Sequence, residues 1–545
     1  MIVPWLCVVA AQFVSAQFIE KPSDLKKVSS SAGTTVRYKE VPSGICENHE
    51  GVKSYTGYVD TAENEHMFFW FFESRNDPKS DPLTLWINGG PGSSSMIGLF
   101  QENGPCRVTP DGKLHNNPHS WNELSNVLYI DQPVSTGFSY SVTGPGIINS
   151  NTGSIKPLNS SHCPDDIKSY EACGTFSLPE ETHSPNSTAR SSHALWKTLQ
   201  GFLGAFKQYN HGKLHITTES YGGHYAPQIA SYILEQNDRD IEDAIKIDVG
   251  TVSIGNGWYD PLVQYQAFYN FTVSPGNTYD LRPYNKSIES KLYDNLYGQG
   301  NCYDQIKNCY ETGSNRVCRK ADTYCAANVE SFLGMFANRD EYDIRQLMPD
   351  PFPYEAYTSY LNTDKVLKAI GAFQNFTESS NAVYESFTKT GDDGRTGHSL
   401  KNLKNLLRKG VVVALYAGDA DYNCNWLGGE VVAEKVGGTA FSSAGYANFT
   451  VDGEVYGQVR QAGNFSFTRI YYSGHEVPFY QPEASLAMLN RTLRSLDLAT
   501  GKESISDEYI SKGTAKSMFR QGNDTVQYKV LPSNSIYNTT SHKPE

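Results

Sequence analysis

The chain has 545 residues, of which 39% are hydrophobic and 19% are charged, so it is long and apolar enough to bury a large core. This composition excludes intrinsic disorder for most of the chain. Its 46 Lys and Arg against 59 Asp and Glu give a net charge of -13, and no basic cluster is interleaved with aromatic residues. Both features argue against nucleic acid as a partner.

The first residues are typical of a secreted protein. An apolar run over 2–14 precedes Val14-Ser15-Ala16, whose small side chains suit signal peptidase, so residues 1–16 are predicted to be a signal peptide. No Lys or Arg precedes the run, and an amino-terminal membrane anchor is the alternative. No later segment is apolar enough to span a bilayer, so no membrane partner is expected for the mature form. Ten Asn-x-Ser/Thr sequons favour secretion over delivery to a vacuole: Asn159, Asn186, Asn270, Asn285, Asn375, Asn448, Asn464, Asn490, Asn523 and Asn538.

Short apolar runs alternate with helical periodicity along the chain. Six runs bounded by Gly, Pro or Asp are predicted to be strands: 66–73, 83–88, 126–131, 214–219, 411–417 and 468–473. Helical spacing is clearest at Leu195, Leu199, Phe202, Leu203 and Phe206, with Ser191 and Ser192 as candidate caps. This alternation predicts an α/β fold with a largely parallel sheet covered on both faces.

Three segments break the alternation. Residues 142–190 are rich in Ser, Asn, Pro and Gly and are predicted to form a surface insertion. Residues 258–350 are predicted to form a cap over the carboxyl edge of the sheet, where active sites of α/β proteins lie. The core is thus expected in two parts, 17–257 and 351–497, followed by a polar extension over 498–545 to which no structure is assigned.

Ten cysteines are present, and nine remain once Cys7 leaves with the signal peptide, so at least one thiol is unpaired. The four in the cap are spaced symmetrically, which suits two nested bridges across a helical hairpin. The suggested pairs are Cys302–Cys325, Cys309–Cys318, Cys163–Cys173 and Cys46–Cys106 with Cys424 free, but sequence does not determine the connectivity. The absence of a Cys-x-x-Cys motif argues against a zinc or redox site.

Ser220 is the candidate nucleophile. It follows the predicted strand 214–219 and precedes a predicted helix, as in a nucleophile elbow, where small neighbours avoid clashes. Gly222 matches the second glycine of G-x-S-x-G, but Thr218 replaces the first. The alternative is an ordinary serine in a Gly-rich turn.

The order of later motifs favours catalysis. A serine hydroxyl needs a histidine to remove its proton and a carboxylate to orient that histidine. Asp419 and Asp421 follow the strand 411–417, and His475 follows the strand ending at 473, which is the Ser, Asp, His order of α/β-hydrolases. Each alone could be a turn-capping aspartate or a surface histidine.

A Gly-rich loop over 86–95 (WINGGPGSSS) follows an early strand and can present backbone N–H groups to an oxyanion. It is not a dinucleotide fingerprint, because Ser95 stands where Gly or Ala is required, and no Walker motif is present. No cofactor is therefore expected.

Together these motifs resemble the serine carboxypeptidases, peptidase family S10. The similarity rests on 86–95 (WINGGPGSSS), 131–133 with 137–140, 219–227 (ESYGGHYAP), 418–426 (GDADYNCNW) and 474–478 (GHEVP). Thr218 and the long insertion resemble secreted fungal members of the carboxypeptidase S1 type more than the vacuolar carboxypeptidase Y type. The resemblance implies an α/β-hydrolase fold and the removal of carboxy-terminal residues from peptides and proteins through an acyl-enzyme.

The resemblance also implies roles for individual residues. Ser220 would be the nucleophile, His475 the general base and Asp421, rather than Asp419, the orienting acid, with Cys424 as a free thiol. Gly90 and Tyr221 would form the oxyanion hole. The substrate carboxylate would be held by Asn88, Gly89, Glu102 and Glu219 with Trp86 beside them.

Two carboxyls in one site retain a proton, because ionising both is costly. A protonated Glu102–Glu219 pair would donate a hydrogen bond to a peptide carboxylate, so binding is expected to be tightest in acid. Ser93 stands where carboxypeptidase Y has a disulfide cysteine, so that bridge is not carried over. Glu476, after the catalytic histidine, suggests a leaving-residue pocket that favours basic residues.

Two other functions share parts of this pattern. Acyl transfer to an alcohol would use the same triad, whereas an esterase or lipase has no use for the glutamate pair. A catalytically dead binding protein is the third alternative, and the intact triad argues against it. Subsite preference and oligomeric state are not determined by the sequence.

Overall fold

The computed structural model describes residues 18–178, 184–348, 353, 355–396 and 398–520. The predicted signal peptide over 1–16 and the sequons at Asn523 and Asn538 lie outside the described residues. Within the described ranges, no helix combines the length and the apolar character needed to cross a bilayer.

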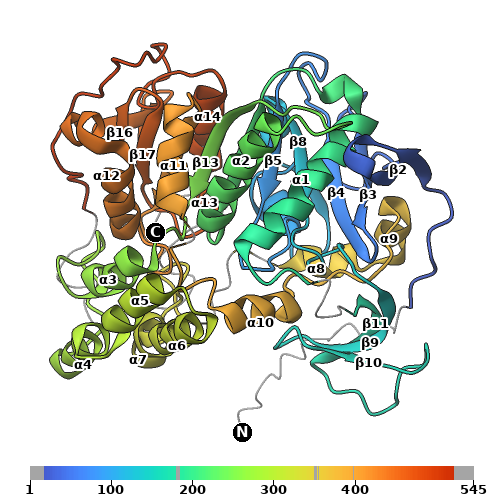
Figure 1. The fold of residues 1–545 in the computed structure, drawn as a ribbon, viewed down its shortest axis with the longest axis horizontal. Coiled ribbons are helices and arrows are strands. Elements are labelled where there is room, and N and C mark those ends of the chain that lie inside the picture. The colour runs from blue at the N-terminus through green and yellow to red at the C-terminus, as the bar shows by residue number, and fades with distance from the viewer. Residues whose placement is uncertain (1–17, 179–183, 349–352, 354, 397, 521–545) are drawn as a thin grey trace, which may run out of the picture.

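A mixed sheet of twelve strands forms the centre of the molecule (Figure 1). Its six middle strands are parallel, and antiparallel strands extend it at both ends. The expected α/β-hydrolase sheet is confirmed in its middle, whereas the antiparallel ends were not predicted. In spatial order the strands are β1 (Lys26–Ser29), β2 (Thr35–Glu40), β3 (Ser54–Ala62), β4 (Glu65–Phe72), β8 (Asn126–Ile130), β5 (Leu83–Ile87), β12 (Leu214–Glu219), β13 (Val249–Gly255), β14 (Val412–Gly418), β17 (Phe465–Ile470), β16 (Glu454–Ala462) and β15 (Ala447–Val451).

Helices cover both faces of the sheet, which explains why β4 is apolar at every position from Met67 to Phe72. Phe69 and Phe71 belong to the core beneath α1 (Thr188–Ala205), α2 (Gly222–Asp238), α11 (Ser399–Arg408) and α12 (Trp426–Ser443). The alternate residues Phe68, Trp70 and Phe72 belong to the core on the other face, with the π-helix η2 (Gly98–Glu102), α8 (Ala356–Leu361), α9 (Asp364–Ile370) and α14 (Pro482–Leu493). Successive side chains of a strand point to opposite faces, so a strand buried on both sides is apolar at every position.

Between β13 and β14 the chain forms a helical cap. Its elements are α3 (Pro261–Thr272), α4 (Lys286–Tyr297), α5 (Cys302–Thr312), α6 (Asn315–Cys325), η5 (Ala326–Glu330) and α7 (Phe332–Ala337). The disulfides Cys302–Cys325 and Cys309–Cys318 join α5 to α6, which are the pairings that the spacing suggested. The cap therefore carries a cross-linked helical hairpin.

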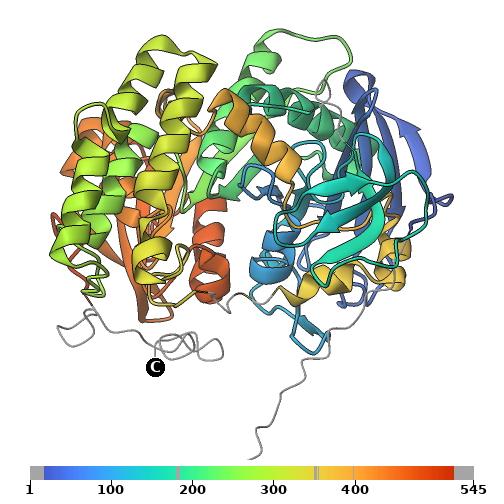
Figure 2. The same ribbon diagram turned by 90° about the horizontal axis from the view of Figure 1, so that it is seen from below.

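The insertion over 142–190 forms a small antiparallel sheet of its own, with β9 (Thr143–Asn149) between β10 (Ile155–Pro157) and β11 (Glu171–Ser177). Cys163 and Cys173 are bonded within it. The cap helices and this small sheet lie on the same side of the large sheet, with α10 (Asn381–Thr390) between them (Figures 1 and 2).

The start of α1 differs from the prediction. The helix begins at Thr188, and its cap is Ser187, whose side chain accepts a hydrogen bond from Arg190 N. Ser191 and Ser192 lie inside the helix and donate their hydroxyls to carbonyls one turn earlier. A serine that bonds back in this way is compatible with a helix interior, so the cap prediction was wrong by one turn.

The polar segment after residue 497 packs along the β15–β17 end of the sheet as far as residue 520. Isolated bridges join Tyr446 to Thr514 and Ala462 to Ile510. Phe519 stacks on Tyr471, with ring centroids 3.7 Å apart. The sheet supplies most of these partners, which explains why the segment has no periodicity of its own.

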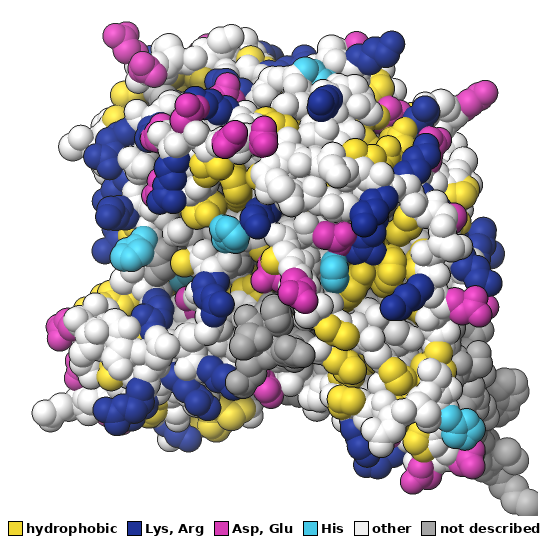
Figure 3. All heavy atoms as spheres, turned by 45° about the vertical axis from the view of Figure 1, so that its right-hand side comes forward, with side chains coloured by type: hydrophobic (Ala, Val, Ile, Leu, Met, Phe, Trp, Pro, Cys, Tyr) yellow, Lys and Arg dark blue, Asp and Glu magenta, His cyan; other side chains and the backbone are white. Residues whose placement is uncertain are grey.

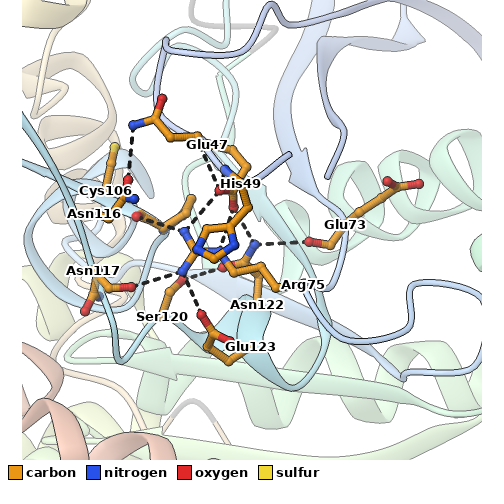
Figure 4. Close-up of polar contacts among 12 residues, drawn as sticks. Glu47, His49, Glu73, Arg75, Cys106, Asn116, Asn117, Ser120, Asn122 and Glu123 are labelled. Atoms are coloured by element: carbon orange, nitrogen blue, oxygen red, sulfur yellow. Dashed lines mark hydrogen bonds and ion pairs between the residues drawn. The ribbon is translucent and has the colours of Figure 1, made fainter. Parts of the chain in front are cut away.

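A buried ionic network lies between β4 and the loop after η2 (Figure 4). The Arg75 side chain is 2% exposed and donates to both oxygens of Glu47, at 3.0 and 3.1 Å, and to Glu123 at 2.8 Å. The Cys46–Cys106 disulfide crosses the same region, where β6 (Cys106–Val108) pairs with β7 (Leu114–Asn116). Asn117, which accepts from Arg75 through its carbonyl, donates to the carbonyl of Glu102. The network thus holds the chain beside a predicted site residue.

Basic and acidic side chains are interspersed over the face that Figure 3 shows.

Candidate active site

Ser220 lies in the turn between β12 and α2 with a φ of +59°, a left-handed conformation that is rare for residues other than glycine. A Cβ at position 222 would lie 1.9 Å from Thr218 Oγ1, so only glycine fits there. Thr218 stands at the position of the usual first glycine. Its hydroxyl is accommodated there because it donates to the carbonyl of Ile87 at 2.6 Å. The turn has the features of a nucleophile elbow.

His475 and Asp421 meet at the carboxyl ends of the late strands. Asp421 Oδ2 accepts a hydrogen bond from His475 Nδ1 at 2.8 Å, and both side chains are buried. Burial disfavours the imidazolium, but the Asp421 carboxylate outweighs this and raises the pKa of His475. Ser220 and His475 line one cavity of about 470 Å³. The geometry suits a nucleophile, a base and an orienting acid.

Asp419 has a different environment, although it is only two residues away. Its carboxylate accepts hydrogen bonds from Tyr279 Oη, from Arg469 at 3.2 Å and from the backbone N–H of Tyr472 at 3.0 Å. These partners tie the cap to the strand ends. Of the two candidate acids, Asp421 is the one beside His475.

Asn256 was missed by the sequence analysis. It follows β13, donates from Nδ2 to Asp421 Oδ2 at 2.7 Å, and accepts from Gly418 N at 2.9 Å. It therefore helps to fix the carboxylate through the same oxygen that contacts His475. The run 249–255, followed by Asn-Gly-Trp, was the available signal, because polar residues that follow buried strands gather at the active edge of such a sheet.

Two backbone N–H groups belong to residues beside the nucleophile. Gly90 and Tyr221 both line a cavity with Ser220, and the N–H of neither donates to another described residue. A Cβ on Gly89 would lie 2.9 Å from Ser220 Cβ, so the Gly-rich loop approaches the elbow as only glycine allows. Free amides beside a nucleophile are suited to stabilise an oxyanion.

The predicted carboxylate-binding residues are held together by a chain of hydrogen bonds. Trp86 Nε1 donates to Asn88 Oδ1 at 2.7 Å, which turns Asn88 Nδ2 toward Glu219 Oε1 at 2.8 Å. Burial, followed by the charges of Glu219 and Glu476, holds the pKa of Glu102 well above its ordinary range. Burial raises the pKa of Glu219 to about 7. The pair therefore keeps a proton in acid.

Other predicted residues lie as follows. Glu476 begins the turn into α13 (Val477–Tyr480) and lines the cavity with Glu219 and His475. Cys424 is a free, buried thiol whose N–H donates to Asp421. In the described part of the chain, Asp421, Cys424 and His475 are the one group with the spacing of metal ligands. Asp421 and His475 already hydrogen-bond to each other, which is the arrangement of a triad.

The sequons differ in accessibility. Asn375 is 6% exposed and its Nδ2 donates to Asn362, while Asn464 Nδ2 donates to the carbonyls of Leu407 and Val411. The fold leaves neither nitrogen free for a glycan. Asn159, Asn285 and Asn448 are exposed.

Comparisons with known proteins define the family. The sequence model of the serine carboxypeptidase family matches residues 42–495. Carboxypeptidase S1 homolog A of Arthroderma otae is 38% identical, over 92% of this chain and 83% of that protein. Carboxypeptidase S1 of Penicillium janthinellum is 37% identical, over 84% and 99%. The chain therefore belongs to the serine carboxypeptidase family and is a hydrolase of the exopeptidase class.

Among solved structures, the fold is similar to that of Kex1Δp, a prohormone-processing carboxypeptidase from Saccharomyces cerevisiae. The TM-score is 0.63 at 22% identity, over 88% of this chain and 97% of that chain.

Proposed function

We propose that the chain removes carboxy-terminal residues through an acyl-enzyme formed on Ser220. His475 takes the Ser220 proton as the oxygen attacks the last peptide carbonyl, and it then gives that proton to the leaving amine. The N–H groups of Gly90 and Tyr221 stabilise the oxyanion. Water, deprotonated by His475, releases the shortened peptide. The observation that carries this proposal is that His475, hydrogen-bonded to the buried Asp421, lines the same cavity as the strained Ser220.

The second part of the proposal concerns the carboxylate of the substrate. Asn88 and Glu219 line the cavity beside Ser220, and Glu219 interacts with the buried Glu102, so that a protonated carboxyl of this pair donates to the terminal carboxylate of the peptide. An ionised pair would repel that carboxylate. This selects free carboxy termini and favours acid conditions. The disulfides and the exposed sequons support a secreted enzyme.

The test uses an amino-blocked dipeptide and its carboxy-amidated twin, assayed at about pH 5 for release of the last residue. The free acid is expected to be cleaved at least about a hundredfold faster, because a neutral amide accepts a weaker hydrogen bond from the protonated glutamate pair than a carboxylate does. Equal rates on the two substrates would argue for a general amidase or esterase. Product analysis with added alcohol separates hydrolysis from acyl transfer.

The pH dependence of KM tests the glutamate pair. The binding form carries the proton, and the pKa of Glu219 is about 7, so KM should be constant in acid and rise as pH passes through about 7. Above that pH the rise should approach about tenfold per pH unit, since one proton is required. The double variant Glu102→Gln, Glu219→Gln cannot lose this proton and should show a flat profile. A flat KM from pH 5 to 8 in the native enzyme would contradict the proposal.

A further inference from the structure

A second cavity opens on the other side of Ser220, and we call it the acidic cavity. It has a volume of about 520 Å³ and shares Gly90, Ser220 and Tyr342 with the cavity that holds Asn88 and Glu219. Tyr221, whose N–H is assigned to the oxyanion hole in the proposed function, also lines it. The two cavities therefore meet at the nucleophile and extend to different sides of it.

Among the described residues, four carboxyl groups and no Lys, Arg or His line the acidic cavity: Asp322, Glu330, Glu341 and Asp393. Asp322 is 6% exposed and has neither a hydrogen bond nor an ion pair from its side chain within the described ranges. Glu330 has one long hydrogen bond, 3.3 Å from Asn423 Nδ2. Buried carboxyls without donors are costly, so this wall is built for a ligand that supplies positive charge and donors.

The protonation of these groups agrees with their packing. Burial, with repulsion from Asp392, raises the pKa of Asp322 to about 7. Burial, with repulsion from Glu341 and Asp322, raises the pKa of Glu330 to about 8. A cation in the cavity would reverse both shifts by stabilising the ionised carboxylates.

The acids of this wall come from the cap helices, from the segment that follows them and from the segment after α10, and two disulfides cross-link one of the helices. Asp322 lies on α6 between Cys318 and Cys325, which are both bonded to α5. Glu330 ends η5, while Glu341 follows the cap helices. Asp393 follows α10, and its carbonyl accepts from Trp258 Nε1. A cross-linked helix that presents a carboxylate beside the nucleophile is a pre-organised binding wall.

The direction in which the peptide binds indicates which substrate residue the acidic cavity holds. If the last residue places its carboxylate at Asn88 and Glu219, the residue before it lies on the other side of Ser220. We infer that the acidic cavity is the subsite for the side chain of the penultimate residue and that it selects lysine or arginine there. Trp258 and Tyr384 offer aromatic surface to the methylene stem and the charged head of such a side chain. This inference rests on the proposed function.

The test compares amino-blocked dipeptides that share a carboxy-terminal alanine and differ at the penultimate residue: lysine, its uncharged analogue norleucine, and glutamate. At pH 6, where the Glu219 proton is retained, the native enzyme should have a kcat/KM for lysine at least about tenfold above that for norleucine, and glutamate should be poorest. The double variant Asp322→Asn, Asp393→Asn should lose about tenfold of the lysine preference and cleave the glutamate peptide better. Glu311→Gln, an exposed acid on α5 that lies outside the cavity, should leave all three ratios unchanged.

A ratio of substrates is independent of how much enzyme is folded, so partial misfolding of the variant does not imitate the result. Equal kcat/KM for lysine and norleucine in the native enzyme, with both peptides cleaved, would overturn the subsite inference alone. Unchanged ratios in the double variant would do the same. Cleavage of none of the three peptides would overturn the proposed function, and the subsite inference with it.

Discussion

Ser220→Ala is expected to lower kcat by about 10⁶-fold, because the acyl-enzyme cannot form without the hydroxyl. KM should change little, since the carboxylate-binding residues Asn88 and Glu219 are untouched. The measurement is single-substrate kinetics on an amino-blocked dipeptide at about pH 5. The melting temperature should be at or above that of the native enzyme. Alanine only removes the hydroxyl oxygen from a strained turn, and residues kept for function are often not the most stable choice at their position.

Ser443→Ala is the matched control, because Ser443 is exposed, lies outside both cavities, and donates its hydroxyl to the carbonyl of Ala440. Its kcat should stay within about threefold of the native value. A Ser220→Ala enzyme with substantial kcat, shown free of contaminating peptidase by a serine-reactive inhibitor, would rule out Ser220 as the nucleophile.

Asp421→Asn is expected to lower kcat, whereas Asp419→Asn is expected to lower the free energy of unfolding. Asparagine at 421 cannot hold His475 in the tautomer that accepts the Ser220 proton, so kcat should fall by about 10⁴-fold with little change in stability. Asparagine at 419 leaves the buried Arg469 without its carboxylate partner, which typically costs about 3–5 kcal/mol in the free energy of unfolding. The kcat per folded molecule of Asp419→Asn should stay within about tenfold of native.

Urea unfolding measures the stability change, and titration of active sites gives kcat per folded molecule. Equal losses of kcat in the two variants would show that Asp421 has no special relation to His475. A loss confined to Asp419→Asn would transfer the role of orienting acid to that residue.

Several elements of the fold could be predicted because their signal is local. The strand β4 is apolar at every position from Met67 to Phe72, where both its faces are buried, and β12 is followed by the Gly-rich turn that carries Ser220. By contrast, β1 (KKVS) is exposed and β2 (TVRYKE) is mostly half-buried, and with three apolar or aromatic residues between them they lack the apolar run that marks the buried strands. The strand β13 contains Gly, Thr and Ser among its valines, which concealed it and Asn256 after it.

The sequence by itself predicted the residues of the proposed catalytic chemistry: a serine in an elbow, followed in order by an aspartate and a histidine at strand ends, and a Gly-rich loop. These features depend on neighbours within a few residues, and a turn or strand end has a local signature. The family resemblance favoured Asp421 over Asp419, but only the tertiary structure gives the physical reason: both follow the same strand, and they differ in their partners across the fold. The tertiary structure alone brought Asp322, Glu330 and Asp393 to one cavity. A cluster of charges from distant segments leaves no recognisable spacing in the sequence, because the distances between its members are set by how the cap folds.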